Sequence, residues 1–90
     1  MGQMETRIAV LGIIVDDKDK ADQVNTLLHQ YGKFIIGRMG LPYEKKQVNI
    51  ISVVLDAPSD IISALSGKLG KLPGVSSKAL YTKAGEGAQG

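Results

Sequence analysis

Two short apolar runs constrain the fold of this chain more than any other feature. Residues 7–15 (RIAVLGIIV) and 48–56 (VNIISVVLD) are rich in β-branched side chains, and both carry apolar residues at odd and even positions alike. Runs of this length and composition predict strands that are buried on both faces. A sheet built around these strands therefore needs a cover on each side.

Two amphipathic segments can supply one of these covers. Apolar residues recur every three or four positions between residues 18 and 31, and Gly32 predicts the end of this helix. Residues 57–60 (APSD) suit the first turn of a second helix, because proline, serine and aspartate all favour that place. The apolar positions of the second helix recur at helical spacing: Ile61, Ile62, Leu65, Leu69 and Leu72.

Two weaker runs complete the order of elements. Residues 33–40 (KFIIGRMG) predict a strand, and the polar connection 41–47 (LPYEKKQ) joins it to the strand at 48–56 as a hairpin. Residues 75–82 predict the last strand. The order strand-helix-strand-strand-helix-strand predicts an α+β, ferredoxin-like βαββαβ plait, in which two helices cover one face of a four-stranded antiparallel sheet.

The length of the chain indicates how this fold is stabilised. We expect one domain over residues 7–82, between an N-terminal extension (1–6) and a flexible C-terminal tail (83–90). A chain of 90 residues buries only about 60–65% of its unfolded surface. Because the chain has no cysteine and one histidine, we expect neither a disulfide nor a structural metal. Oligomerisation is the remaining common source of further burial.

The uncovered sheet face supports the same conclusion. Two helices cover only one face, so roughly several hundred Å² of apolar surface would face water in a monomer. At ~25 cal/mol per Å², covering it contributes on the order of 10 kcal/mol before the costs of association. We therefore predict a homodimer or homotetramer packed through the open sheet face, although the alternation leaves open which face that is. The residues selected for the interface are Ile13, Ile51, Val53 and Leu55.

Candidate catalytic groups are sparse, and we predict no enzyme activity, no cofactor and no metal site. His29 lies near the apolar stripe of the first helix, which favours a structural residue over a catalytic group or a ligand. Asp16 and Asp17 could hold a cation or form an acid–base pair. Their place directly before a helix favours a capping role, in which they accept hydrogen bonds from its free N–H groups.

Several binding functions are also disfavoured. The net charge of +2 arises from 11 basic and 9 acidic residues dispersed along the chain, which does not make a nucleic-acid surface. RNA-binding plaits stack bases on aromatic side chains of the sheet, and the two apolar runs contain none. No apolar run approaches the roughly 18–20 residues of a membrane span, so we expect a cytoplasmic protein that does not bind membranes.

Residues 66–75 (SGKLGKLPGV) have the glycine and lysine content of a phosphate-binding loop but not its pattern. In a P-loop, Gly-Lys precedes serine or threonine and opens a helix, whereas here leucine follows and the stretch ends the second predicted helix. Lys68 and Lys71 then complement the negative end of the helix dipole, and Pro73-Gly74 explains the stop. Inside a helix, Gly67 and Gly70 each cost about 1 kcal/mol relative to alanine, which indicates close packing or the approach of a ligand.

Three segments carry a resemblance to known proteins: residues 24–29 (VNTLLH), residues 38–42 (RMGLP), and residues 64–70 (ALSGKLG) with the nearby PGV at 73–75. In their order and spacing, these segments resemble the iron-only (FeFe) hydrogenase system regulator family. The resemblance extends over about residues 6–82. It implies a ferredoxin-like, ACT-like domain, similar to the C-terminal domain of the nickel-responsive repressor, and a regulatory role in a hydrogenase system.

The chain departs from the nickel repressor in two respects. The metal ligands of that repressor are histidines and a cysteine around the second and third strands, and residues 38–49 contain neither residue type. No DNA-binding helix pair precedes the first strand, so we expect no direct contact with DNA. In ACT-like domains, ligands commonly lie at subunit interfaces near the first strand-to-helix turn. The resemblance therefore implies a ligand site at Asp16 and Asp17, with Arg38 as an anion partner, unless Arg38 is simply a solvated charge on an edge strand.

These observations favour a stand-alone, oligomeric, ACT-like regulatory module that binds a small effector or a partner protein. Two alternatives stay open. One is a small ferredoxin-like enzyme that uses Asp16, Asp17 or His29, and the other is a purely structural protein-interaction domain.

Overall fold

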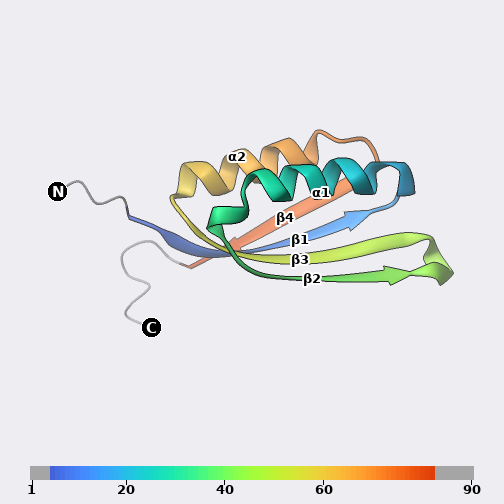
Figure 1. The fold of residues 1–90 in the computed structure, drawn as a ribbon, viewed down its shortest axis with the longest axis horizontal. Coiled ribbons are helices and arrows are strands. Elements are labelled where there is room, and N and C mark those ends of the chain that lie inside the picture. Colours follow the sequence, from blue (N-terminus) through green and yellow to red (C-terminus); the bar gives the residue numbers. More distant parts are fainter. Residues whose placement is uncertain (1–4, 83–90) are drawn as a thin grey trace.

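The computed structural model describes residues 5–82, in which two helices lie on one face of a four-stranded sheet (Figure 1). The strands are β1 (Arg7–Val15), β2 (Ile35–Tyr43), β3 (Val48–Ala57) and β4 (Val75–Tyr81), and the helices are α1 (Ala21–Gln30) and α2 (Ser59–Gly70). The sheet order is β2-β3-β1-β4, and all neighbouring strands are antiparallel. The predicted α+β, ferredoxin-like plait is confirmed. The expected flexible tail lies outside the described residues, as do the first four residues.

The strand β2 is longer than the sequence predicts. It runs through Pro42 to Tyr43, where we expected the polar connection to begin. A proline is tolerated here because β2 lies at the edge of the sheet and has a partner strand on one side only. The hairpin then closes through a short 3₁₀ turn, Glu44–Lys46, followed by Gln47 in the left-handed conformation with φ 57°.

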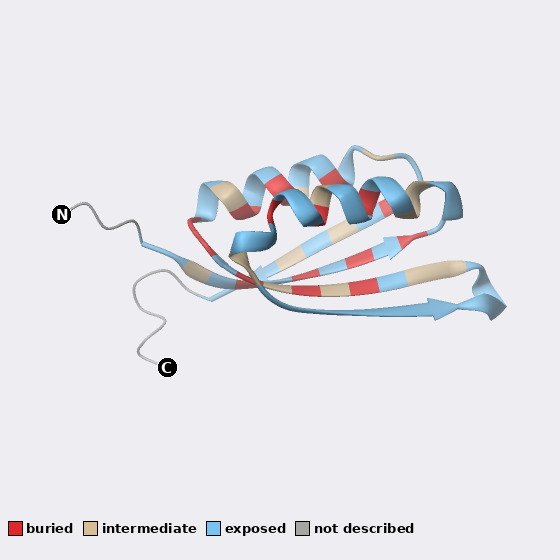
Figure 2. Cartoon of the chain, viewed as in Figure 1, coloured by how far each residue is buried: buried red, intermediate tan, exposed pale blue. Residues whose placement is uncertain are grey.

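The two faces of the sheet differ in what covers them (Figure 2). Along β1 and β3, buried residues alternate with more exposed ones, as strands with a side-chain period of two require. The buried set lies beneath α1 and α2 and contains Ala9, Leu11, Ile13, Val15, Ile51, Val53, Leu55 and Ala57. The helices contribute Val24, Leu28, Ile62, Leu65 and Leu69 to the same core.

The interface residues predicted from the sequence lie on the wrong face. Ile13, Val53 and Leu55 are 0% exposed and Ile51 is 6% exposed, all within a single chain. These four side chains fill the core under the helices, so they are not available at the open face. The period of two along each strand separates the side chains of the two sheet faces correctly. Because the side chains of both faces are apolar, this period does not show which face the helices cover.

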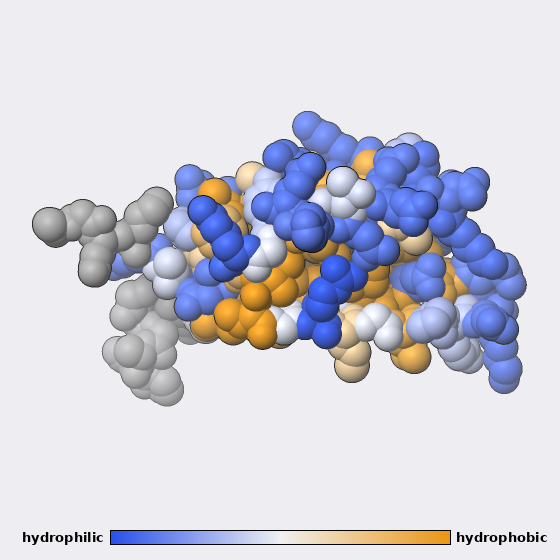
Figure 3. Space-filling model, in the orientation of Figure 1, coloured by the Kyte–Doolittle hydropathy of each residue, from blue (hydrophilic) through white to orange (hydrophobic). Residues whose placement is uncertain are grey.

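The uncovered side of the sheet is the surface that we call the open face. Strand register places Val10 of β1 between Val54 of β3 and Leu80 of β4, and it places Ile14 beside Ile50. Large exposed apolar side chains on this face come from all four strands: Ile8, Val10, Ile14, Met39, Leu41, Tyr43, Ile50 and Leu80. In the space-filling view, hydrophobic atoms gather below the helices, whose outer surface is mostly hydrophilic (Figure 3).

Candidate functional site

The open face has a hollow at its centre. Gly12 of β1 has no side chain, and a Cβ added there would meet nothing within 4 Å. Its neighbours across the sheet are Ser52 of β3 and Lys78 of β4, so the middle row presents little apolar bulk. The resulting depression has a volume of about 320 Å³ and is lined by Gly12, Ile13, Ile14, Ile50, Ser76, Ser77 and Lys78.

Charged groups are few on the open face. Within the four strands, the alternation assigns to this face one carboxylate, Asp56 of β3, and one ammonium group, Lys78 of β4. Asp56 pairs with Ile8 and Lys78 pairs with Gly12, so the two charges lie in different rows of the sheet. The open face is thus an apolar surface with one charge of each sign.

Asp16 and Asp17 connect β1 to the first helix, and both serve local structure. The Asp17 side chain accepts a hydrogen bond from the N–H of Asp19, 3.0 Å away, and caps the 3₁₀ turn Lys18–Lys20 that precedes α1. The N–H of Asp16 donates to the carbonyl oxygen of Gly74 at 2.7 Å. The predicted capping role is therefore confirmed for Asp17, and the turn also fastens β1 to the loop before β4.

Gly74 is required by this contact. Its φ is +76°, a conformation that side chains disfavour, and an added Cβ would lie 2.7 Å from Cβ of Asp17. The Pro-Gly end of the stretch SGKLGKLPGV thus packs directly against the turn that follows β1. The sequence predicted a stop at this glycine, but not its partner.

Arg38 lies apart from the two aspartates. It pairs with the buried Val53 in the sheet, so it projects from β2 on the side of the helices. Its Nη2 donates to Oδ1 of Asn25 on α1 at 2.7 Å. Arg38 lines a groove of about 300 Å³ between α1 and the β2–β3 hairpin, and neither Asp16 nor Asp17 is among the described residues that line this groove. The structure therefore does not bring the three predicted ligand residues together.

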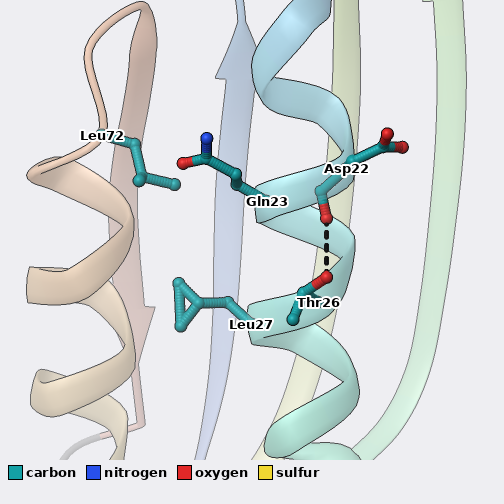
Figure 4. A pocket seen from close by; sticks show the side chains of 5 residues that line it. All are labelled: Asp22, Gln23, Thr26, Leu27 and Leu72. Atoms are coloured by element: carbon teal, nitrogen blue, oxygen red, sulfur yellow. Dashed lines mark hydrogen bonds between the residues drawn. The ribbon is translucent and has the colours of Figure 1, made fainter.

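A second groove lies between α1 and the loop after α2 (Figure 4). Gln23 and Leu27 point from α1 toward α2, and Leu72 reaches toward them from the loop. The volume is about 320 Å³. The hydroxyl of Thr26 donates to the carbonyl oxygen of Asp22 at 2.9 Å, so this polar side chain is satisfied within its own helix. Sequence reasoning missed the groove because Leu27 and Leu72 were assigned to the apolar faces of the helices, where they are only partly buried.

The lysine-rich end of α2 is a structural feature. Lys68 donates from Nζ to the hydroxyl of Tyr31 at 2.9 Å, and its ammonium lies 5.3 Å from the centre of that ring. This contact joins α2 to the end of α1. Close packing at Gly67 and Gly70 was expected from the sequence, but a Cβ at either position would meet nothing within 4 Å. That expectation is wrong for contacts inside the chain, where both glycines are exposed.

Residues 5–82 contain neither a cluster of metal-binding side chains nor a membrane-spanning helix. His29 is exposed on α1. No group of three or more histidine, cysteine, aspartate or glutamate side chains gathers in this part of the chain to hold a metal ion. No helix among these residues is both long enough and apolar enough to cross a membrane.

Comparisons with known proteins add the family. Residues 7–79 match the family described as "TM1266-like: Iron-only hydrogenase system regulator, putative". The chain belongs to this family. The chain is similar to the protein TM1266 from Thermotoga maritima, whose structure is solved, with 41% sequence identity and a TM-score of 0.84. The match covers 88% of this chain and 100% of the TM1266 chain. No curated protein matches the chain. The resemblance to this family seen in the sequence is confirmed.

Proposed function

We propose that this member of the regulator family acts as a regulatory module without enzyme activity, assembled from copies that pack through their open faces. The observation that carries the proposal is the open face itself. Eight large apolar side chains of this face keep between 37% and 72% of their surface exposed in a single chain. A patch of this kind marks an interaction surface on a protein that dissolves in water.

The size of the open face suits an interface. Four strands about 4.8 Å apart and about eight residues long give a flat area on the order of 500 Å². The accessible area is larger than this, because side chains stand off the sheet. A standard stable interface buries about 800 Å² on each partner. The open face is therefore large enough to form most of such an interface.

A second copy of the chain is the partner that this surface fits best. In a two-fold interface, the same patch meets itself, so every feature needs its complement within that patch. The open face offers both a hollow at Gly12 and protruding side chains such as Leu80, which is 72% exposed. It also offers one charge of each sign, Asp56 and Lys78, in separate rows. This combination supports a homodimer, from which a homotetramer would need a second contact.

An assembly through the open faces leaves the helix side free. The grooves beside α1 then remain available to a small effector or to a partner protein, as expected of an ACT-like module. We place this activity in the cytoplasm, with which the absence of cysteine agrees. The regulated process is assigned from the family, as the control of an iron-only hydrogenase system.

The test combines mass and function. Val54→Asp places a carboxylate at the centre of the open face, and Ala64→Asp places one on the exposed outer surface of α2 as a matched control. We expect Val54→Asp to dissociate the assembly and to fail to restore hydrogenase activity in a strain that lacks the protein. Ala64→Asp should keep the assembly intact and restore the activity. A Val54→Asp chain that restores activity as a monomer would contradict the proposal.

A further inference from the structure

We propose that the groove between α1 and the β2–β3 hairpin binds a small carboxylate with an apolar tail and no ammonium group, such as a branched 2-oxo acid. The role of this ligand as a regulatory effector rests on the proposed function, whereas its binding depends on the groove alone. The residues that carry the argument line the groove from three elements: Ala21 and Asn25 of α1, Arg38, Gly40 and Pro42 of β2, and Asn49 and Ile51 of β3.

The groove exists because the edge strand extends beyond the cover of the helices. Every second residue of β2 faces the helices, namely Arg38, Gly40 and Pro42. Their partners on β3 are Val53, Ile51 and Asn49, respectively. Except for Ile35 at its start, every residue of β2 is exposed. The side of β2 that faces α1 is therefore left open, and α1 forms the opposite wall. The volume of about 300 Å³ matches the lower end of the range of ligand pockets, about 300–1,000 Å³, and suits a metabolite better than a nucleotide.

Arg38 supplies the positive charge that an anion needs. Its hydrogen bond to Oδ1 of Asn25 holds the guanidinium between β2 and α1. This partner is a neutral amide, so it orients the charge without neutralising it. A guanidinium has five N–H donors in a planar fork, and the donors that Asn25 does not use suit a carboxylate in the bidentate geometry. Ala21, the first residue of α1, lines the same groove and brings the positive end of the helix dipole close to the anion.

The rest of the lining selects the other end of the ligand. Ile51 and Pro42 provide apolar contact, and Asn49 is a partly buried amide at the start of β3. A side-chain amide can donate to a keto or hydroxyl oxygen. Among the described residues that line the groove, none is acidic, so the ammonium group of an amino acid would find no oppositely charged partner there. This difference favours a 2-oxo acid over the amino acid of the same shape.

Gly40 makes the proposal testable without damage to the fold. It lines the groove, and a Cβ added there would meet nothing within 4 Å. Valine also suits a strand better than glycine does. Gly40→Val should therefore fold normally while it fills the groove. Arg38→Gln removes the charge and keeps a donor toward Asn25. Arg7→Gln is the matched control, because Arg7 bonds the carbonyl oxygen of Thr82 and lies over the ring of Tyr81, outside the groove.

The experiment is a titration of the full chain with 4-methyl-2-oxopentanoate, followed by amide NMR and by calorimetry. L-leucine, which differs by its ammonium group, and inorganic phosphate serve as comparison probes. We expect saturable shifts at Asn25, Arg38 and Asn49, and at least about tenfold weaker binding for Arg38→Gln, for Gly40→Val and for both comparison probes. Arg7→Gln should bind within about twofold of the unchanged chain.

Three results would overturn the inference. They are the absence of saturable shifts with the oxo acid up to roughly 10 mM, binding that Arg38→Gln leaves unchanged, and equal binding of L-leucine or phosphate. The molecular mass of the protein in the same samples is measured by sedimentation. The titration is then repeated with the Val54→Asp variant. If the chain is a monomer but binds the oxo acid, the proposed assembly fails and the groove stands. If it assembles but does not bind, the groove fails alone.

Discussion

On β1, Leu11 and Ile13 are fully buried beneath the helices, whereas their neighbours on the opposite face, Val10 and Ile14, keep 38% and 46% of their surface exposed. The side chains on the two faces are alike in kind. The difference lies in the layers, because two helices can cover only one side of a sheet. The comparison teaches that apolar character identifies both faces as surfaces for contact, while the number of layers within the chain decides which of them stays uncovered.

The adjacent residues Val53 and Val54 give the sharpest form of this comparison. Val53 is 0% exposed in the core, so Val53→Asp would bury a carboxylate without a partner. An uncompensated buried charge costs about 3–5 kcal/mol, a large part of the stability of a small domain. We expect loss of the folded state, seen as a collapsed thermal transition in circular dichroism. A cooperative transition near that of the unchanged chain would contradict the placement of Val53 under the helices.

Val54→Asp should have a different effect, because Val54 is only partly buried and lies on the open face. In the monomer the new carboxylate meets water, so the chain should fold. In the assembly the charge is desolvated, and we expect association at least about a hundredfold weaker. Analytical ultracentrifugation over a range of concentrations measures this change. Unfolding of Val54→Asp, or an unchanged mass, would remove the distinction between the two faces.

Leu80 tests the periphery of the open face. Because its side chain is 72% exposed, Leu80→Ser should change the free energy of unfolding of the monomer by less than about 0.5 kcal/mol. In the assembly it should weaken association by about tenfold, through loss of apolar contact. Leu11→Ser is the matched change on the covered face and should destabilise the monomer instead. Equal effects of both substitutions on stability would contradict the comparison.

The smallest effect is expected from the charges of the open face. Lys78→Glu should weaken association by only about two- to fivefold, since the long lysine side chain can keep its ammonium group in water, and solvated ion pairs contribute less than about 1 kcal/mol. The double change Asp56→Lys with Lys78→Glu exchanges the two charges and should restore the affinity and its dependence on salt. Additive effects of the two single changes would show that Asp56 and Lys78 do not face each other across the interface.

The sequence predicted the fold in most of its elements. The order of strands and helices, the end of α2 at the glycine-lysine stretch and the cap at Asp17 follow from local patterns, and they are confirmed. The end of β2 was missed because Pro42 was interpreted as a turn residue, although an edge strand tolerates it. Local patterns succeed here because caps and turns depend on residues that are near in sequence.

The candidate sites depended on long-range contacts and were harder to predict. The groove brings Arg38 to Asn25 and to the start of β3, an arrangement that follows from strand register and not from a motif. One signal in the sequence distinguishes the open face from the face that the helices cover. Gly12 and Ser52 interrupt the exposed set, whereas the set under the helices has no such gap at its centre.

Assembly through the open face is tested most directly by the mass of the unchanged chain in solution. Sedimentation equilibrium at micromolar concentration should give a mass of about twice 9.6 kDa, or a higher even multiple, and Val54→Asp should reduce it to 9.6 kDa. A single species of 9.6 kDa for the unchanged chain across the concentration range would contradict the account.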